Sequence, residues 1–388
     1  MLTRICKGVG AICLWAIVLI CLIITIAPAF LDRIYYSGPI SAHYDGAHFD
    51  NPDGEINMPT ASGKGGNMLG RFLLSQASRP PWPDHVEVHP NVPPAHVNGT
   101  AMRATWVGHA TVLIQADGLN ILTDPIWSDR AGPMAGLGPK RVAAPGINFA
   151  ALPKIDVVLV SHNHYDHMDL PTLKRLWDRD RPLIITSLGN DTIIKGAGVP
   201  SRALDWGGMT QLANGAKVHV VRNHHWSSRW GKDKNRALWS AFLIETRAGN
   251  IFFAGDTGAG NMQWANEARR FGPIRLAMIP IGAFRFNPGQ MSNDAHIGPE
   301  QAVEVLERLG ASTAIPIHWG TFRLSNEAYD TPPAMLKLFT ACAGIAHERF
   351  APLAIGQAIN VAPYSAPARA KADSRPCLPN SPQLAALK

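Results

Sequence analysis

The sequence predicts an α/β fold in which two β-sheets pack face to face and helices cover their outer faces. Three observations support this prediction. Short runs rich in β-branched residues recur along most of the chain, as is typical of strands. Two pairs of these runs lie close enough together in the sequence to form hairpins. Helix-like segments are interspersed among them, and such a mixture is typical of layered α/β proteins.

Composition agrees with a folded chain. Of 388 residues, 46% are hydrophobic and only 17% are charged, so most of the chain should be globular. The formal net charge is +7, which mildly favours an anionic substrate or a lipid surface as partner. No arginine-rich run is present in the sequence, so we expect no nucleic-acid partner.

Residues 1–35 are predicted to be a membrane anchor. Val9–Phe30 carries no charge, and at about 1.5 Å per helical residue this segment can cross a hydrocarbon core of about 30 Å. Arg4 and Lys7 precede it, so the positive-inside rule predicts a single-pass protein of a bacterial inner membrane with its catalytic domain in the periplasm. The alternative is a secreted protein, because the small residues ending at Ala29 resemble a signal-peptide cleavage site.

The remaining chain divides into three parts. Residues 36–100 are rich in Gly and Pro and are predicted to form an extended arm. Residues 101–363 contain all the strand-like runs and form the predicted catalytic domain. Residues 364–388 are rich in Ala, Pro and Ser and are predicted to be a disordered tail. Cys342 and Cys377 are consistent with either a disulfide or two free thiols.

Strands are expected where the β-rich runs lie: 104–107, 111–115, 119–123, 155–160, 183–187, 217–222, 239–246, 250–254, 276–281 and 313–317. Helices are expected at 170–177 and 299–306, each with a proline near its start, and a short one at 68–76. The loop 126–148 carries Trp127, Met134 and Leu137, and it is predicted either to rim an apolar substrate groove or to pack against the arm.

The site is predicted around Ser161–Asp169, which contains an H-x-H-x-D-H run directly after the buried strand 155–160. Imidazole and carboxylate groups are the ligand set that suits zinc and similar divalent metals. In an extended loop, His162 and His164 project to the same side and can hold one metal ion. Asp166 and His167 follow one turn later and can hold a second. The alternative is a polar surface loop.

Three further candidates follow other strands. Adjacent residues point to opposite faces, so only one of His224 and His225 can readily ligate. Asp256 follows an apolar strand and can bridge two cations, and His318 follows the last strand. A lone histidine beside a glycine turn is typical of a structural role, so His109 is not expected to be a ligand.

These motifs resemble the metallo-β-lactamase superfamily, and in particular the N-acylphosphatidylethanolamine-hydrolysing phospholipase D family and its bacterial relatives. The segments that carry the resemblance are 105–111, 122–125, 162–167, 225–226, 255–257, 281–284, His296 with 299–303, and 318–320. The resemblance implies an αββα sandwich and two Zn²⁺ ions, although other divalent metals are possible. It assigns His162, His164 and His225 to one metal, Asp166, His167 and His318 to the other, and Asp256 to both.

The expected function is a dinuclear zinc phosphodiesterase of phospholipase D type. Two zinc ions would lower the pKa of a shared water toward about 7 and supply hydroxide to attack phosphorus. We expect Asp166 or His296 to assist proton transfer, and a phospholipid or other anionic ester as substrate. A lactonase, carboxylic esterase or β-lactamase would use the same metals, and a non-enzymatic envelope regulator is a third possibility. Four cations after His225, from 229 to 236, are either a solvated loop or a site for anionic head groups.

Overall fold

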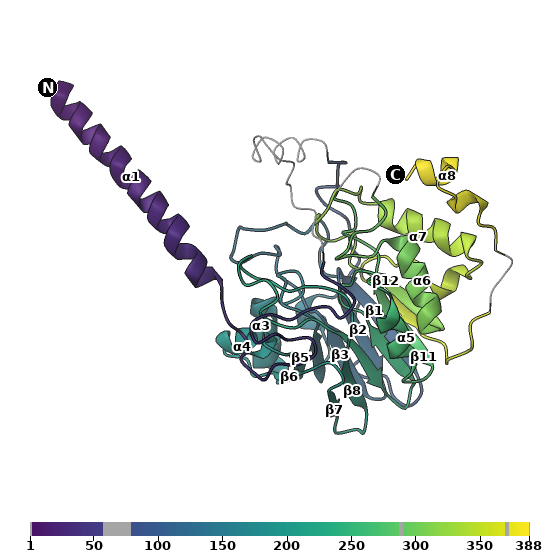
Figure 1. The fold of residues 1–388 in the computed structure, drawn as a ribbon. Helices are drawn as coiled ribbons and strands as arrows, with labels where there is room; N and C mark the ends of the chain where they lie inside the picture. The colour runs from purple at the N-terminus through teal and green to yellow at the C-terminus, as the bar shows by residue number, and fades with distance from the viewer. Residues whose placement is uncertain (1, 57–78, 287–289, 369–371, 388) are drawn as a thin grey trace.

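The computed structural model describes residues 2–56, 79–286, 290–368 and 372–387. Two β-sheets form its centre (Figure 1). The helix expected at 68–76 lies outside the described residues.

The first sheet has seven strands in the order β13-β1-β2-β3-β4-β5-β6. Neighbouring strands from β13 to β3 pair antiparallel, and those from β3 to β6 pair parallel. The strands of this sheet are β1 (Met102–Gly108), β2 (Thr111–Ala116), β3 (Leu119–Thr123), β4 (Val157–Val160), β5 (Leu183–Ser187), β6 (Arg202–Leu204) and β13 (Ala358–Asn360).

The second sheet has six strands in the order β12-β11-β10-β9-β8-β7. Here β7 to β10 pair antiparallel, whereas β10, β11 and β12 are parallel. The strands of this sheet are β7 (Met209–Gln211), β8 (Lys217–Val221), β9 (Ala241–Glu245), β10 (Asn250–Phe253), β11 (Ile274–Pro280) and β12 (Thr313–Ile317).

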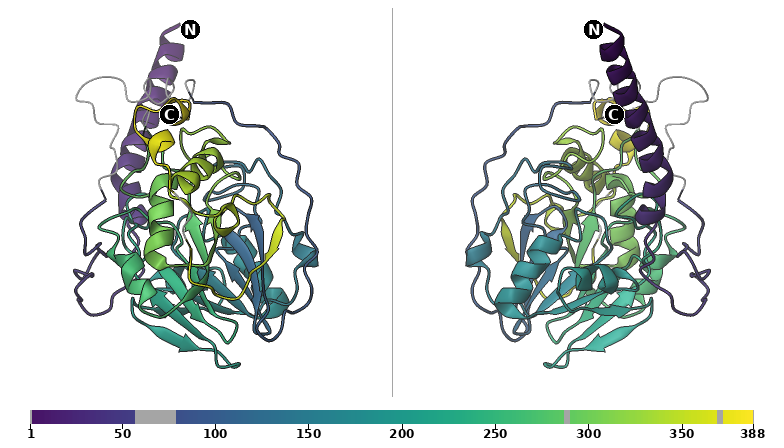
Figure 2. Two further views of the ribbon diagram at one scale, coloured as in Figure 1. Left: turned by 90° about the vertical axis from the view of Figure 1, so that its right-hand side faces the viewer. Right: turned by 90° about the vertical axis from the view of Figure 1, so that its left-hand side faces the viewer.

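Helices cover the outer face of each sheet, α3 and α4 on the first and α5, α6 and α7 on the second (Figures 1 and 2). Their apolar faces explain this placement, since Leu173 and Leu176 of α3 join the core of the first sheet and Leu306 of α6 joins that of the second. The helices are α3 (Leu170–Asp180), α4 (Asn190–Gly196), α5 (Gln263–Arg269), α6 (Pro299–Leu309) and α7 (Thr331–Cys342).

Strand β4 shows why the sequence folds into layers. Val157 and Leu159 point into the core between the two sheets, whereas Val158 and Val160 point into the core beneath α3 and α4. All four side chains are therefore buried, and a continuous apolar run is what a strand covered on both faces requires. The predicted αββα sandwich is confirmed.

The expected transmembrane helix is not supported. Residues 9–30 do lie in a helix, α1 (Leu2–Leu31), which projects away from the sheets (Figure 1). Within the part of the chain that the structure describes, however, no helix has the combination of length and apolar character needed to cross a membrane.

The described residues of the predicted arm, 36–56 and 79–100, have little regular structure. They form only isolated bridges, such as those joining Tyr44 to Ser41 and to Phe49. Tyr44 and Phe49 are buried and pack against Trp239 of the body. The arm is thus held on the body by an aromatic cluster.

The prediction of a disordered tail is wrong for residues 374–387. This segment forms η3 (Arg375–Cys377) and α8 (Pro382–Ala385), and Leu384 is buried in the core beneath α7. A disulfide joins Cys377 to Cys342 at the end of α7. The amino-acid composition does not predict this ordered structure, because the segment is held in place by one disulfide and one buried leucine.

Candidate metal centre

The candidate site lies where strands from both sheets end. Strands β3 and β4 run parallel in the first sheet, and β10 and β12 run in a common direction in the second. Because β8 and β10 are both antiparallel to β9, β8 shares that direction. The carboxyl ends of these strands meet at one edge of the sandwich, and the polar residues that follow each strand are brought together there.

All seven predicted ligands converge at this edge. They fall into two groups, and within each group the donor atoms lie within 4.8 Å of one another. The first group is His162, His164, His225 and Asp256, and the second is Asp166, His167 and His318 together with His109. These are the groups that the resemblance implies, apart from His109.

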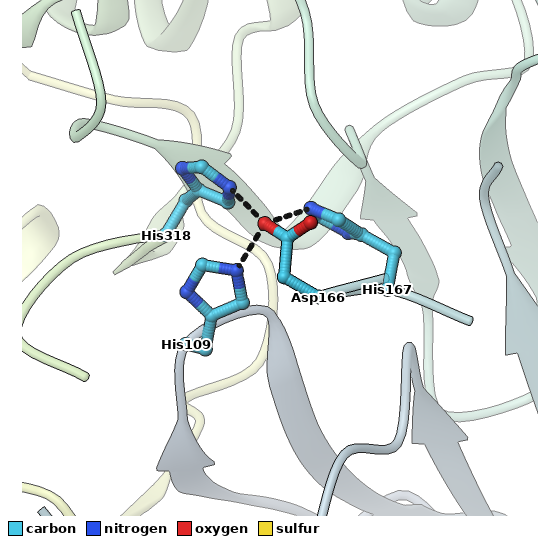
Figure 3. Close-up of side chains that lie close together, drawn as sticks. All are labelled: His109, Asp166, His167 and His318. Carbon is cyan, nitrogen blue, oxygen red and sulfur yellow. Dashed lines mark hydrogen bonds and ion pairs between the residues drawn. The ribbon is translucent and has the colours of Figure 1, made fainter. Parts of the chain in front are cut away.

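In the second group, Asp166 is the centre and three imidazoles surround it (Figure 3). Its Oδ2 lies 3.3 Å from Nε2 of His167, 3.3 Å from Nε2 of His318 and 2.9 Å from Nε2 of His109. The three histidines come from different places, namely the loop after β4, the end of β12 and the turn between β1 and β2. The Nε2 atoms of three histidines thus point toward one carboxylate oxygen, Oδ2 of Asp166.

In the first group, Nε2 of His162 and Nδ1 of His164 lie 2.8 Å apart. His225 completes the set, with its ring centre 4.7 Å from that of His162 and 5.2 Å from that of His164. Nδ1 of His225 faces the carbonyl oxygen of Ala295 at 2.9 Å and therefore carries the proton. Its Nε2 is left free to ligate, and within the described residues this buried atom has no hydrogen-bond partner.

Asp256 joins the two groups. Its Oδ2 lies 3.0 Å from Nε2 of both His167 and His318, and 3.9 Å from Nε2 of His225. Oδ1 of Asp256 is buried without a hydrogen-bond partner among the residues described. A buried carboxylate that touches both groups is well placed to bridge two cations.

Gly255 makes the approach of Asp256 possible. Its φ is +60°, and a Cβ there would lie only 2.7 Å from Cβ of Ser161. A side chain would force the β10 loop away from the loop after β4. The absence of a side chain at 255 is therefore what lets the two halves of the site meet.

Asp124, which follows β3, fixes the metal-binding loop through hydrogen bonds to Ser161 and His167. Its Oδ2 accepts hydrogen bonds from Nδ1 of His167 and from the hydroxyl of Ser161, both at 2.6 Å. Its Oδ1 accepts a hydrogen bond from the Ser161 backbone N–H at 2.7 Å. The contact orients the imidazole of His167, leaving its Nε2 to face the carboxylates Asp166 and Asp256.

The protonation states suit divalent metal ions. Burial opposes ionisation of Asp166 and Asp256, but the surrounding histidines outweigh it and hold the pKa of both well below the usual range. Burial lowers the pKa of His164 to about 4, so this imidazole is neutral at pH 7. Burial also disfavours the charge on His318, yet Asp256 and Asp166 raise its pKa to about 9, so metal binding would release a proton there. The donor set therefore fits zinc or a similar ion.

His109 is the residue that the sequence analysis missed as a functional candidate. It is buried, its φ is +54°, and its backbone N–H donates to the Thr321 hydroxyl at 2.8 Å. Its carbonyl oxygen accepts from the backbone N–H of His318 at 3.0 Å. A local turn motif gave no hint of this role, because Asp166 lies 57 residues further along the chain.

His296, proposed from sequence as a proton-transfer residue, lies beside the metal donors. Its side chain is 11% exposed, and its Nδ1 is 3.7 Å from Oδ2 of Asp256. Its ring stacks at 5.3 Å on that of His318. Burial lowers the pKa of His296 to about 4, which leaves the imidazole neutral at pH 7.

Two adjoining cavities flank the metal-binding loop, with volumes of about 590 and 420 Å³. Both are lined by Tyr165, which lies between two predicted ligands, and by Arg229. The rest of the larger cavity is largely apolar, whereas the smaller one also carries Asp129, Arg130 and Asp169, and Leu170 and Pro133 line both. The two cavities thus form a groove beside the metal-binding loop, and none of the predicted metal ligands lines it.

The loop 126–148 contributes to this groove in part. Met134 lines the smaller cavity, as predicted. Leu137 is half exposed and lines neither cavity, and Trp127 packs on Phe149 instead. Of these three side chains, Met134 therefore rims the groove, whereas Trp127 packs in the core beneath α3.

Both arginines of the basic loop after His225 have partners within the protein. Arg236 pairs with Asp32 of the arm at 2.7 Å. Arg229 faces the groove, where its guanidinium lies 3.9 Å from the ring centre of Tyr165 and donates to the carbonyl oxygens of Asn163 and Met168.

Comparison with known proteins agrees with this geometry. A family model described as a beta-lactamase superfamily domain matches residues 119–319. A Caenorhabditis elegans protein named N-acyl-phosphatidylethanolamine-hydrolyzing phospholipase D 1 is 32% identical over 307 residues, which cover 74% of this chain and 85% of the relative. A Methanopyrus kandleri protein named a metal-dependent hydrolase is 28% identical over 225 residues, or 57% of this chain and 85% of that protein.

Among solved structures, a possible metal-dependent hydrolase from Veillonella parvula superposes with a TM-score of 0.54. The match covers 67% of this chain and all of that one, at 15% sequence identity. This likeness supports the fold.

Proposed function

The chain belongs to the metallo-β-lactamase superfamily of metal-dependent hydrolases, and from this premise we propose that it is a phosphodiesterase of phospholipase D type. The substrate class we propose is N-acylphosphatidylethanolamine-like lipids. The products would be a phosphatidic acid and an N-acylethanolamine. The name of the C. elegans relative supports this choice.

The observation that carries the proposal is the position of Asp256 between the two groups of donors. Its Oδ2 lies 3.0 Å from Nε2 of both His167 and His318 in the second group, and 3.9 Å from Nε2 of His225 in the first. Such a site can hold two divalent ions side by side. When bound, the ions would lower the pKa of a water molecule and neutralise the anionic oxygens of a phosphodiester.

The groove supports a lipid over a small polar ester. Leu170, Ile193 and Trp230 give an apolar surface along the larger cavity, on which an acyl chain can lie. Arg229 and Arg33 add positive charge to that cavity. An amphiphile with one anionic group matches both features.

The chain itself would supply proton transfer through His296. Phosphorus–oxygen cleavage leaves an alkoxide on the departing N-acylethanolamine, and that oxygen must gain a proton. The neutral imidazole of His296 would accept the proton that the attacking water releases and then donate it to this oxygen. Its Nδ1 lies 3.7 Å from Oδ2 of Asp256. Asp166 is less suited, because three imidazoles already occupy its Oδ2. We expect His296→Ala to slow turnover by about 10² to 10⁴-fold, and unchanged turnover would remove this role.

The test uses the full-length protein loaded with zinc and given N-acylphosphatidylethanolamine in detergent micelles, with products identified by mass spectrometry. Asp256→Asn is the matched control, since it keeps the size of the side chain and removes its charge. Phosphatidic acid and N-acylethanolamine from the parent alone would support the proposal. Release of free fatty acid, or activity only on lactones and simple esters, would refute the phosphodiester substrate and favour a lactonase or carboxylic esterase.

A further inference from the structure

We propose that Asn51, in the arm, is a positioning residue of the metal centre that holds the predicted ligand His225 by its backbone. The inference rests on the proposed ligand role of His225. The two residues are 174 positions apart in the sequence. The arm brings them together because Phe49, which is fully buried, fastens this stretch to the body through a 2.8 Å hydrogen bond from its N–H to the carbonyl oxygen of Asn235.

The carboxamide of Asn51 pairs with both polar backbone groups of His225. Its Nδ2 donates to the His225 carbonyl oxygen at 2.9 Å, and its Oδ1 accepts from the His225 N–H at 3.2 Å. Nε1 of Trp239 donates to the same Oδ1 at 3.2 Å. Because an indole N–H and a backbone N–H are donors only, the orientation of the amide is unambiguous.

This clamp completes the control of the His225 side chain. The imidazole is already fixed at Nδ1 by the carbonyl oxygen of Ala295, at 2.9 Å. With backbone and ring both held, Nε2 can point only toward His162 and Asp256. His225 is fully buried, so loss of the Asn51 side chain would remove these hydrogen-bond partners from its backbone N–H and C=O.

The arm also holds the neighbouring His224, facing away from the metal donors. Oδ1 of Asp53 lies 2.8 Å from Nδ1 of His224, and Oδ2 of Asp53 accepts from the backbone N–H of Asn261 at 3.0 Å. Asn51 and Asp53 thus hold adjacent histidines on opposite sides. The contacts explain physically why His225, and not His224, reaches the metal donors.

The side chain required at position 51 is specific. One planar group must donate and accept side by side, which an amide does and a carboxylate or an alkyl group does not. Asn51→Ala removes both contacts, and Asn51→Asp removes the donor while keeping the shape. The matched control is His43→Gln, because His43 also fastens the arm, through a 2.7 Å contact with Asp205, but touches no predicted ligand.

The experiment measures zinc affinity by competition with a chromogenic chelator, and the thermal unfolding midpoint of each metal-free protein. Relative to the parent, we expect Asn51→Ala to bind one zinc equivalent about 10- to 100-fold more weakly, which is the usual effect of losing a group that orients a ligand. Asn51→Asp should show a smaller loss of the same kind. His43→Gln should keep the affinity of the parent even if its unfolding midpoint falls.

Parent-like affinity in both Asn51 variants would overturn the inference, and so would an equal loss in His43→Gln. If Asn51→Ala does not fold, Asn51→Asp decides by the same comparison. A His225→Ala variant separates this inference from its premise. Weakened zinc binding in His225→Ala alone refutes only the role of Asn51, whereas parent-like binding in His225→Ala refutes the ligand assignment as well.

Discussion

The contact between His109 and Asp166 offers a sharp test of how the metal centre is held. We expect His109→Leu to weaken the binding of one metal ion, because it removes a hydrogen-bond donor from a predicted ligand. Nε2 of His109 lies 2.9 Å from Oδ2 of Asp166, and the imidazole is 1% exposed. A carboxylate carries no proton, so the imidazole N–H must donate.

The magnitude follows from the kind of contact. A buried hydrogen bond to a charged group contributes about 1.5–3 kcal/mol, which corresponds to a change in affinity of about 10- to 150-fold. His109→Gln is the matched control, because the amide of glutamine can place an N–H near the position of Nε2. It also keeps an unbranched Cβ at φ +54°, so the backbone strain is similar to that in His109→Leu. We expect affinity in His109→Gln to stay within about tenfold of the parent.

The assay is chelator competition for zinc, with urea unfolding of the metal-free proteins as the measure of stability. Parent-like zinc affinity in His109→Leu would refute the reasoning. An equal, large loss in His109→Leu and His109→Gln would also refute it, because that pattern would mean that the imidazole binds the metal itself.

Three further outcomes are expected. Gly255→Ala should destabilise the protein by about 2–5 kcal/mol in urea unfolding, since the new Cβ meets Ser161 in a left-handed conformation; a change below about 1 kcal/mol would contradict the close approach. Replacing Cys342 and Cys377 by serine should make the segment 374–387 sensitive to limited proteolysis without reducing zinc content, and an unchanged digest would show that packing alone holds it. Removing metal with a chelator should abolish hydrolysis and lower the unfolding temperature, both restored by zinc, because two groups of buried donors lose their ions; full activity after verified metal removal would exclude the proposed chemistry.

Sequence patterns predicted most of the framework for a local physical reason. A strand buried on both faces must be a continuous apolar run, and the run at 155–160 ends in the histidines that the structure places at the edge of the sheets. The same reasoning located the strands before His225, Asp256 and His318. Short elements such as α4 and β6 were missed, because a few residues carry too little periodicity to be recognised.

The sequence alone therefore determined the layers, the metal-binding motif and the strand ends that carry the other predicted ligands, because each depends on residues close together in the chain. Tertiary structure decided the contacts that span long separations. His109 meets Asp166 across 57 positions, and Asn51 meets His225 across 174. No periodicity or motif encodes such a pair, since its partners become neighbours only when the sheets have packed and the arm has docked.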